Sequence, residues 1–239
     1  MAWVAGVDGC KAGWVAAFCD TDKPEEPIVK VFDHFGQILE SAYAPKIVAV
    51  DMPIGLPDRI EGSGRGPEQA ARAVLGPRRG SVFSIPSRSA VYAIDRPVVG
   101  MNDISRAHAL SCEIARRTSS PESAFSRQAF MIFPKIREID ALLRAEPELG
   151  ERVKEVHPEL AFWSMNGEIP LLFAKKNPLG ESERIALLRL QGFTKKAVVA
   201  AEPKGAKRDD VLDALAALVV ARHIAAGRGK PFPDPPGRD

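Results

Sequence analysis

Four aspartates occupy positions from which their side chains could share a metal ion. Asp8 and Asp51 each end a short, almost wholly apolar segment, which is typical of a buried strand. Asp210 and Asp213 are three residues apart at the start of a segment with helical apolar spacing, so both lie on one side of its first turn. Clustered carboxylates need cations, and their hard oxygen atoms favour Mg²⁺ or Mn²⁺. Two such ions about 4 Å apart would activate water and stabilise the leaving oxygen of a phosphodiester.

Each aspartate also has an ordinary structural explanation. An aspartate after a strand commonly forms a turn, and Asp209-Asp210 would cap a helix. The segment 51–57, Asp-Met-Pro-Ile-Gly-Leu-Pro, restricts the backbone after Asp51 and would hold it in one place, with or without chemistry. We favour a shared site because the predicted order of strands and helices would allow all four carboxylates to converge.

The elements that must position these aspartates indicate an α/β fold. Asp8 and Asp51 would lie close together if their strands were parallel neighbours in one sheet. Strands are predicted over residues 2–8, 14–19, 28–32, 46–51 and 153–156, and helices over 34–44, 67–75, 102–118, 134–145, 181–190 and 209–226.

We interpret the chain as a single domain over residues 1–226. A helical insertion over about 66–150 would separate the fourth and fifth strands, and a proline-rich tail would occupy residues 227–239.

Basic and polar residues elsewhere suggest how a substrate could be held. Residues 62–89 hold five arginines and one glutamate, and Arg78-Arg79 offers forked donors for phosphate, although a solvated arginine face explains them equally well. Lys175-Lys176 is a weaker basic pair. The segment 155–159, Glu-Val-His-Pro-Glu, surrounds a strand end, but a lone histidine before proline is more often structural, and a transition-metal site is not expected.

Composition excludes several other classes of protein. The 239 residues carry 33 Lys and Arg against 31 Asp and Glu, so net charge gives no general preference for nucleic acid. No apolar run is long enough to span a membrane, and no P-loop or Ser-His-Asp arrangement is present. Three cysteines without a C-x-x-C pair argue against disulfides, so we expect a cytoplasmic protein. Because no apolar run could span a membrane, we also expect no membrane partner.

Several motifs in one order resemble a domain-of-unknown-function family of predicted RNase H-like nucleases. The resemblance spans about residues 3–225 and implies a ribonuclease H-like fold, with a five-stranded mixed sheet flanked by helices. The motifs are Gly6–Trp14, Asp51–Pro57, Leu75–Phe83, Pro134–Ile136, Glu155–Glu159 and Asp209–Ala214.

The resemblance also implies roles for individual residues. In that superfamily, acidic residues of the first strand, the fourth strand and the last helix bind the catalytic metals, which by position are Asp8, Asp51, and Asp210 with Asp213. Together with the basic segments, the motifs give a set of substrate-binding candidates: Lys11, Arg78, Arg79, Lys135, Glu155, His157, Glu159 and Lys175.

Three functions fit these observations. The first is metal-dependent phosphodiester hydrolysis on nucleic acid or another phosphate-containing substrate, with Mg²⁺ or Mn²⁺ as cofactor. The second is phosphoryl transfer or nucleotide binding of the actin and sugar-kinase kind, for which a homodimer would have to supply the second domain. The third is a non-catalytic binding module of the same fold. Metal binding separates the third from the others, and ATP turnover separates the second from the first.

Overall fold

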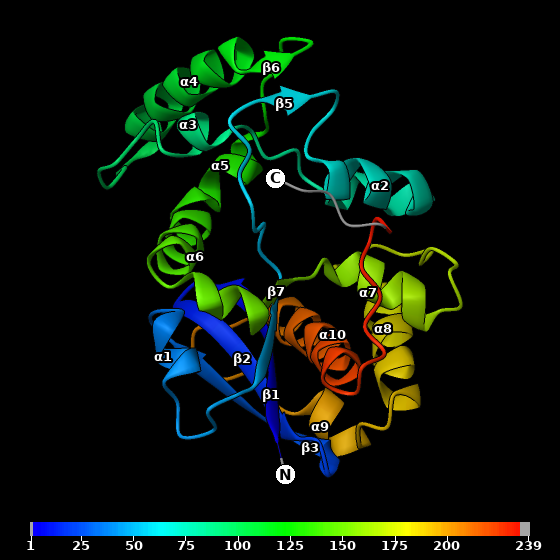
Figure 1. Cartoon of the computed structure of the whole chain (residues 1–239). Helices are drawn as coiled ribbons and strands as arrows, with labels where there is room; N and C mark the ends of the chain where they lie inside the picture. Colours follow the sequence, from blue (N-terminus) through cyan, green and yellow to red (C-terminus); the bar gives the residue numbers. More distant parts are fainter. Residues whose placement is uncertain (1, 235–239) are drawn as a thin grey trace. The chain divides into compact units, whose positions relative to one another are not determined.

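The predicted strands form one five-stranded sheet in the computed structural model, which describes residues 2–234 (Figure 1). The sheet order is β3-β2-β1-β4-β7. β1 (Trp3–Cys10) pairs antiparallel with β2 (Gly13–Asp20), which pairs antiparallel with β3 (Lys23–Phe32). β4 (Ile47–Val50) lies parallel between β1 and β7 (Val153–Glu155). The prediction of an α/β fold with a five-stranded mixed sheet is therefore confirmed.

The chain divides into two compact units, of which the first contains this sheet. Within the described residues, the first unit holds residues 2–52, 75–78 and 142–230, and the second holds 53–74, 79–141 and 231–234. The interpretation as one domain with an insertion stays a prediction.

The second unit is mainly helical. A short two-stranded sheet of β5 (Ile60–Glu61) and β6 (Ser119–Ser120) accompanies its helices. A 3₁₀ helix, Gly76–Ser81, and α6 each have residues in both units. The helices are α2 (Gly66–Val74), α3 (Arg88–Val91), α4 (Met101–Arg117), α5 (Arg127–Met131) and the first part of α6 (Phe133–Ala145).

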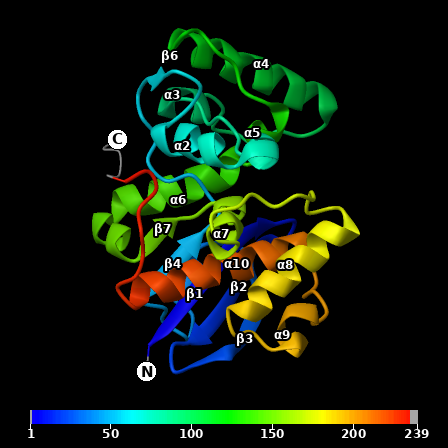
Figure 2. The same cartoon turned by 90° about the vertical axis from the view of Figure 1, so that its right-hand side faces the viewer.

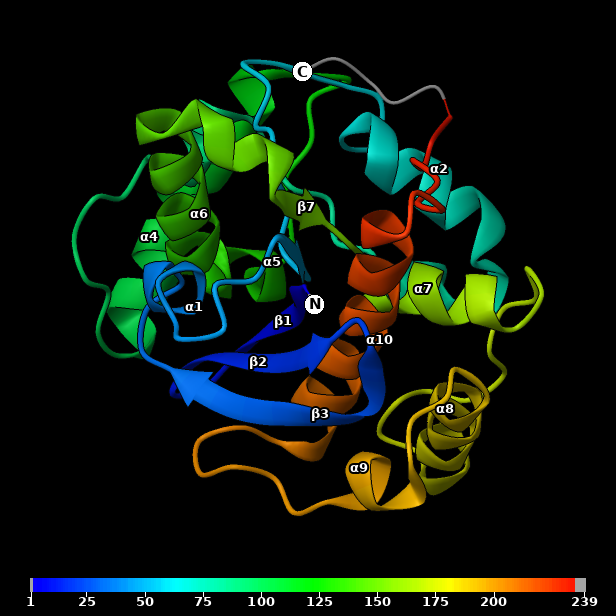
Figure 3. The same ribbon diagram turned by 60° about the horizontal axis from the view of Figure 1, so that its bottom comes forward.

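One long helix of the first unit, α10 (Arg208–Ala225), packs against β1, β2 and β4 and also contacts α7 and α8 (Figure 2). Its residues from Val211 to Val219 are all buried, and a helix covered on all sides in this way must be apolar around most of its circumference. Figure 3 shows β3 along the edge of the sheet, with α9 beside it. The other helices of this unit are α1 (Gly36–Leu39), α7 (Pro158–Met165), α8 (Pro178–Leu190) and α9 (Lys195–Val199).

Two predicted helices have different lengths in the structure. The helix predicted over 34–44 is a single turn, α1, after which the chain continues in turns: the Ser41 N–H donates to the carbonyl oxygen of Ile38 at 3.3 Å and the Ala44 N–H to that of Ser41 at 2.8 Å. α8 begins at Pro178, three residues before the predicted start, because the Asn177 side chain accepts the backbone N–H of Leu179 at 2.9 Å and caps the helix.

Two further predictions concern membrane spanning and the C-terminal tail. Among residues 2–234, no helix has both the length and the apolar character that crossing a membrane requires. The predicted proline-rich tail is described as far as residue 234, and residues 235–239 lie outside the described part of the chain.

A close approach between β1 and α10 sets the geometry of the candidate site. A Cβ atom at Gly6 would lie 2.0 Å from the backbone nitrogen of Leu218 and 2.2 Å from the carbonyl oxygen of Ala214, so only glycine fits there. Side chains alternate between the two faces of a strand, so Asp8 projects from the same face of β1 as Gly6. The first carboxylate is thereby directed toward α10.

Candidate metal centre

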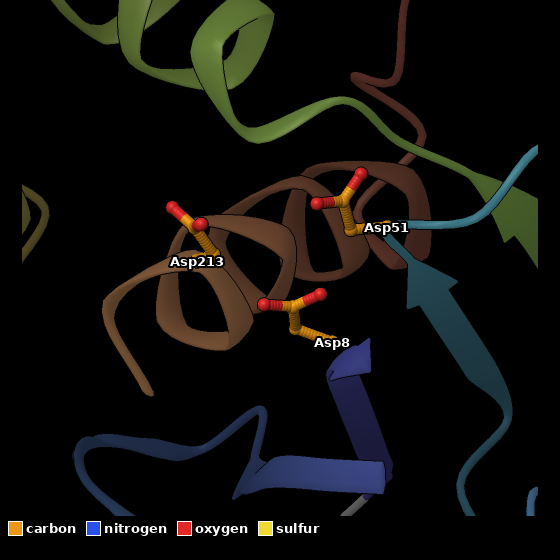
Figure 4. A group of neighbouring side chains, drawn as sticks. All are labelled: Asp8, Asp51 and Asp213. Atoms are coloured by element: carbon orange, nitrogen blue, oxygen red, sulfur yellow. The ribbon is translucent and has the colours of Figure 1, made fainter. Parts of the chain in front are cut away.

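Asp8, Asp51 and Asp213 form a compact acidic cluster in the first unit. Each offers a carboxylate oxygen, and these three oxygens lie within 4.8 Å of one another. Figure 4 shows the three side chains directed into a common space from β1, from the end of β4 and from the second turn of α10. Oxygen ligands bind Mg²⁺ or Ca²⁺ at about 2.0–2.6 Å, so two ligands of one ion can be at most about 5 Å apart. The cluster therefore has the dimensions of a divalent-cation site.

The parallel pairing of β1 with β4 brings the first two aspartates together. Val7 is opposite Val50 in the register, and the Asp51 N–H donates to the carbonyl oxygen of Val7 at 2.9 Å. Asp8, two residues before the end of β1, and Asp51, the residue that follows β4, therefore lie side by side. Asp8 is further fixed because its Oδ1 accepts the N–H of Gly9 at 2.6 Å.

Asp210, the fourth predicted ligand, has a different position. It lies in the first turn of α10, where its Oδ2 accepts the backbone N–H of Lys207 at 2.9 Å and so caps the start of the helix. Among the described residues, it is outside the group of three whose oxygens lie within 4.8 Å of one another. Asp210 thus has a capping role, its charge also raises the pKa of Asp8, and its assignment as a metal ligand stays a prediction.

A lysine is part of the same constellation. Nζ of Lys175 donates to Oδ2 of Asp213 at 2.7 Å and lies 3.8 Å from Oδ2 of Asp209. Lys175 was predicted to bind substrate, and the structure places it directly on a cluster carboxylate. Partial burial lowers the pKa of Lys175, but the negative charges of Asp213, Asp8 and Asp51 outweigh this effect and raise it above its ordinary value. The ammonium group is charged at every physiological pH.

Burial and mutual repulsion raise the pKa values of the cluster carboxyls. Burial, followed by the charges of Asp51 and Asp213, raises the pKa of Asp8 well above its usual range. Burial raises the pKa of Asp51 to about 7, with Lys175 opposing the shift and Glu155 adding to it. Burial likewise raises the pKa of Asp213 to about 6, again against Lys175. The cluster thus carries more negative charge than its surroundings compensate, which is the condition that a bound cation relieves.

These shifts predict that the metal-free first unit loses stability as the pH rises from about 4 to about 7. A carboxyl group with a higher pKa in the folded than in the unfolded state binds more protons when folded. Its contribution to the free energy of unfolding is therefore fully present at low pH and is lost as the pH rises through the folded pKa. Urea unfolding followed by tryptophan fluorescence measures this unit selectively, because Trp3, Trp14 and Trp163 all belong to it.

Asp51→Asn is the reference for this measurement, since it removes the group with a pKa of about 7. Carboxyls outside the cluster titrate alike in both proteins, whereas Asp8 and Asp213 also lose the repulsion of Asp51, so the difference between the urea midpoints reports on the whole cluster. We expect the variant to gain stability relative to the wild type as the pH rises. A difference that does not change with pH would contradict the assigned repulsion.

The residues of the 155–159 segment surround the cluster on the β7 side. Glu155 ends β7 opposite Val50, next to Asp51. Nδ1 of His157 accepts the backbone N–H of Glu159 at 3.2 Å and caps α7, which is the structural role considered for it. Glu159 is buried and adds negative potential at both Asp51 and Asp213.

Two arginines hold Glu159. Its Oε1 accepts hydrogen bonds from Arg184 Nη2 at 2.6 Å and from Arg78 Nη2 at 3.2 Å. Oε2 of Glu159 is buried and has no hydrogen-bond partner among residues 2–234. Arg184 is 1% exposed and was not singled out from the sequence. Nothing in its spacing within α8 relates it to a glutamate 25 residues away.

The remaining substrate-binding candidates are spread over the chain. Lys11 is exposed in the turn between β1 and β2. Arg79 is exposed and Lys135 lies in α6, and both belong to the second unit, so their role stays a prediction.

Most arginines of residues 62–89 bind other groups of the protein. This arrangement differs from both explanations offered for them, a solvated arginine face and a phosphate-binding segment. In the second unit, Arg65 pairs with Glu68 at 2.7 Å, Arg72 donates to the carbonyl oxygen of Ser63, and Arg88 pairs with Asp140.

Comparison with known proteins gives a family but no characterised relative. No curated protein and no solved structure gives a match to this chain. A family model described as "Protein of unknown function (DUF429)" matches residues 6–238, and the chain therefore belongs to this family.

Proposed function

We propose that this protein is a metal-dependent phosphodiesterase that acts on nucleic acid. The observation that carries the proposal is the convergence of Asp8, Asp51 and Asp213 within 4.8 Å in a buried, negatively charged site. Three hard oxygen ligands in this arrangement suit Mg²⁺ or Mn²⁺.

The positions of the three aspartates support an RNase H-like assignment. They come from the first strand, from the end of the fourth strand and from the last helix, which are the elements that supply catalytic carboxylates in the superfamily the sequence resembles. The five-stranded mixed sheet flanked by helices is the architecture that the resemblance implies. In this proposal, residues 53–74 and 79–141 of the second unit are the helical insertion between β4 and β7.

The chemistry assigned to the residues follows from their charge and contacts. A divalent cation held by the three aspartates would polarise a phosphoryl oxygen and lower the pKa of a bound water. β1, β4 and α10 hold the carboxylates before substrate arrives, so little reorganisation accompanies binding. Lys175, with its side chain 37% exposed, presents a positive charge between the cluster and solvent, where a phosphate group would approach.

The direct test is hydrolysis of defined substrates by the purified protein with Mg²⁺, Mn²⁺ or excess EDTA. Single- and double-stranded DNA, RNA, bis(p-nitrophenyl) phosphate and ATP separate the candidate activities. We expect cleavage of a nucleic-acid substrate that requires metal and is lost in Asp213→Asn.

The other outcomes identify the alternatives. ATP turnover without phosphodiester cleavage would replace the proposal with phosphoryl transfer. Metal binding without turnover of any substrate would reject the nuclease and leave a binding module.

A further inference from the structure

We propose that the ammonium group of Lys175 takes the place of a second metal ion, so that the centre binds one divalent cation instead of two. This inference rests on the metal site of the proposed function and specifies how many ions that site holds. It replaces the expectation of two metal ions about 4 Å apart.

The contacts of Lys175 are those of a bound cation. Its Nζ lies 2.7 Å from Oδ2 of Asp213, an oxygen of a cluster residue whose side chain is only 5% exposed. The same Nζ is 3.8 Å from Oδ2 of Asp209, one turn earlier in α10. A second metal ion at this oxygen of Asp213 would lie beside the ammonium group of Lys175, and the two cations would repel each other.

The charges in the cluster favour the same stoichiometry. Three carboxylates carry three negative charges, and one divalent cation with one ammonium group balances them. Among these four groups alone, a second divalent ion would leave an excess of positive charge beside Lys175. Glu159 is held by Arg184 and Arg78, but Asp209, Asp210 and Glu155 add negative charge around the three ligands. The contact between Lys175 and Asp213 therefore carries the stoichiometry, and the charge count only agrees with it.

The segment that carries Lys175 is fixed by α8, so this lysine is more than a mobile surface cation. A Cβ atom at Gly180 would lie 2.2 Å from the carbonyl oxygen of Ala174, so glycine allows the segment to pack directly on the helix. The Asn177 N–H donates to that same carbonyl oxygen at 2.9 Å. Arg184 Nη1 donates to the carbonyl oxygen of Phe173 at 3.2 Å. The backbone on both sides of Lys175 is therefore held in place.

The number of bound Mn²⁺ ions tests the inference. Isothermal titration calorimetry gives the stoichiometry, and electron paramagnetic resonance distinguishes an isolated Mn²⁺ from two coupled ions. We expect the wild type to bind one Mn²⁺ per chain with the spectrum of an isolated ion. Lys175→Met should bind two, with a spectrum broadened by their interaction, because Asp213 and Asp209 are then free to accept a second cation.

Lys176→Met is the matched control, because it removes the neighbouring exposed lysine without touching the Asp213 contact. It should bind one ion as the wild type does. Lys175→Arg keeps the positive charge and should also bind one.

The outcomes separate this inference from the proposed function. Two coupled Mn²⁺ ions in the wild type would overturn the inference and leave the metal centre intact, and this measurement needs no variant. A folded Lys175→Met protein that binds a single ion with wild-type affinity would also overturn it. Absence of Mn²⁺ binding in both proteins would reject the metal centre together with the inference.

Discussion

Asp8→Asn is expected to abolish tight Mn²⁺ binding and metal-dependent phosphodiester cleavage together, without unfolding the protein. The amide keeps the shape of the carboxylate, and its oxygen can still accept the Gly9 N–H that Asp8 accepts in the wild type. The cluster loses one of its three negative charges, however, and with it an anionic ligand. Because even outer-sphere partners of a metal contribute about 10–100-fold in affinity, we expect Mn²⁺ affinity to fall at least about 100-fold.

The same substitution should not weaken the metal-free protein. Asp8 is buried beside Asp51 and Asp213, and their repulsion opposes folding when all are charged. At pH 8 without metal, the urea midpoint of Asp8→Asn should therefore equal or exceed that of the wild type. Added Mn²⁺ should raise the wild-type midpoint by mass action and leave the variant nearly unchanged.

Asp20→Asn supplies a matched control within the same sheet. Asp20 is also buried, it ends β2, and its Oδ1 accepts the N–H of Asp22 at 3.0 Å. It lies opposite Trp3 in the register, at the other end of β1 from Asp8. It should therefore retain Mn²⁺ binding. If Asp8→Asn responded to Mn²⁺ as strongly as the wild type and Asp20→Asn do, the assignment of Asp8 as a ligand would be wrong.

The sheet and its two aspartates could be predicted because the signals for them are local. β1, β2 and β4 are short apolar runs bounded by polar residues, and Asp8 and Asp51 stand where such runs end. Parallel neighbours bring their ends to one edge, so their juxtaposition followed once β1 and β4 were placed side by side.

The other parts of the site depend on tertiary contacts that have no local signal. Lys175 reaches Asp213 across 38 residues, and its sequence neighbourhood resembles any exposed basic pair. The choice between Asp210 and Asp213 depends on how α10 is rotated against β1. Asp210 has the sequence context of both a ligand and a helix cap, and the cap is formed. Tertiary packing determines which of the two aspartates faces the cluster, and the local sequence pattern carries only indirect information about packing.

Gly6→Ala should be the most damaging single substitution of one methyl group in the first unit. The added Cβ would lie 2.0 Å from the nitrogen and 2.6 Å from the Cα of Leu218, and 2.2 Å from the carbonyl oxygen of Ala214. These are backbone atoms, so no rotamer change can relieve the overlap, and α10 must move away from β1. Because overpacking a rigid interior commonly destabilises a protein by 1–3 kcal/mol, we expect a loss of about 3 kcal/mol in the free energy of unfolding.

The displacement should also reach the metal centre, because α10 carries Asp213 and β1 carries Asp8 on the face that Gly6 shares. Under conditions that keep it folded, such as low urea and low temperature, Gly6→Ala should still bind Mn²⁺ more weakly than the wild type. Gly36→Ala is the control, since a Cβ atom there meets nothing within 4 Å and the residue opens the single turn of α1. Its free energy of unfolding, from urea unfolding followed by the three tryptophans of the first unit, should be unchanged or raised by up to about 1 kcal/mol. If Gly6→Ala matched this control in both stability and Mn²⁺ affinity, the contact between β1 and α10 would not be what positions Asp8 and Asp213.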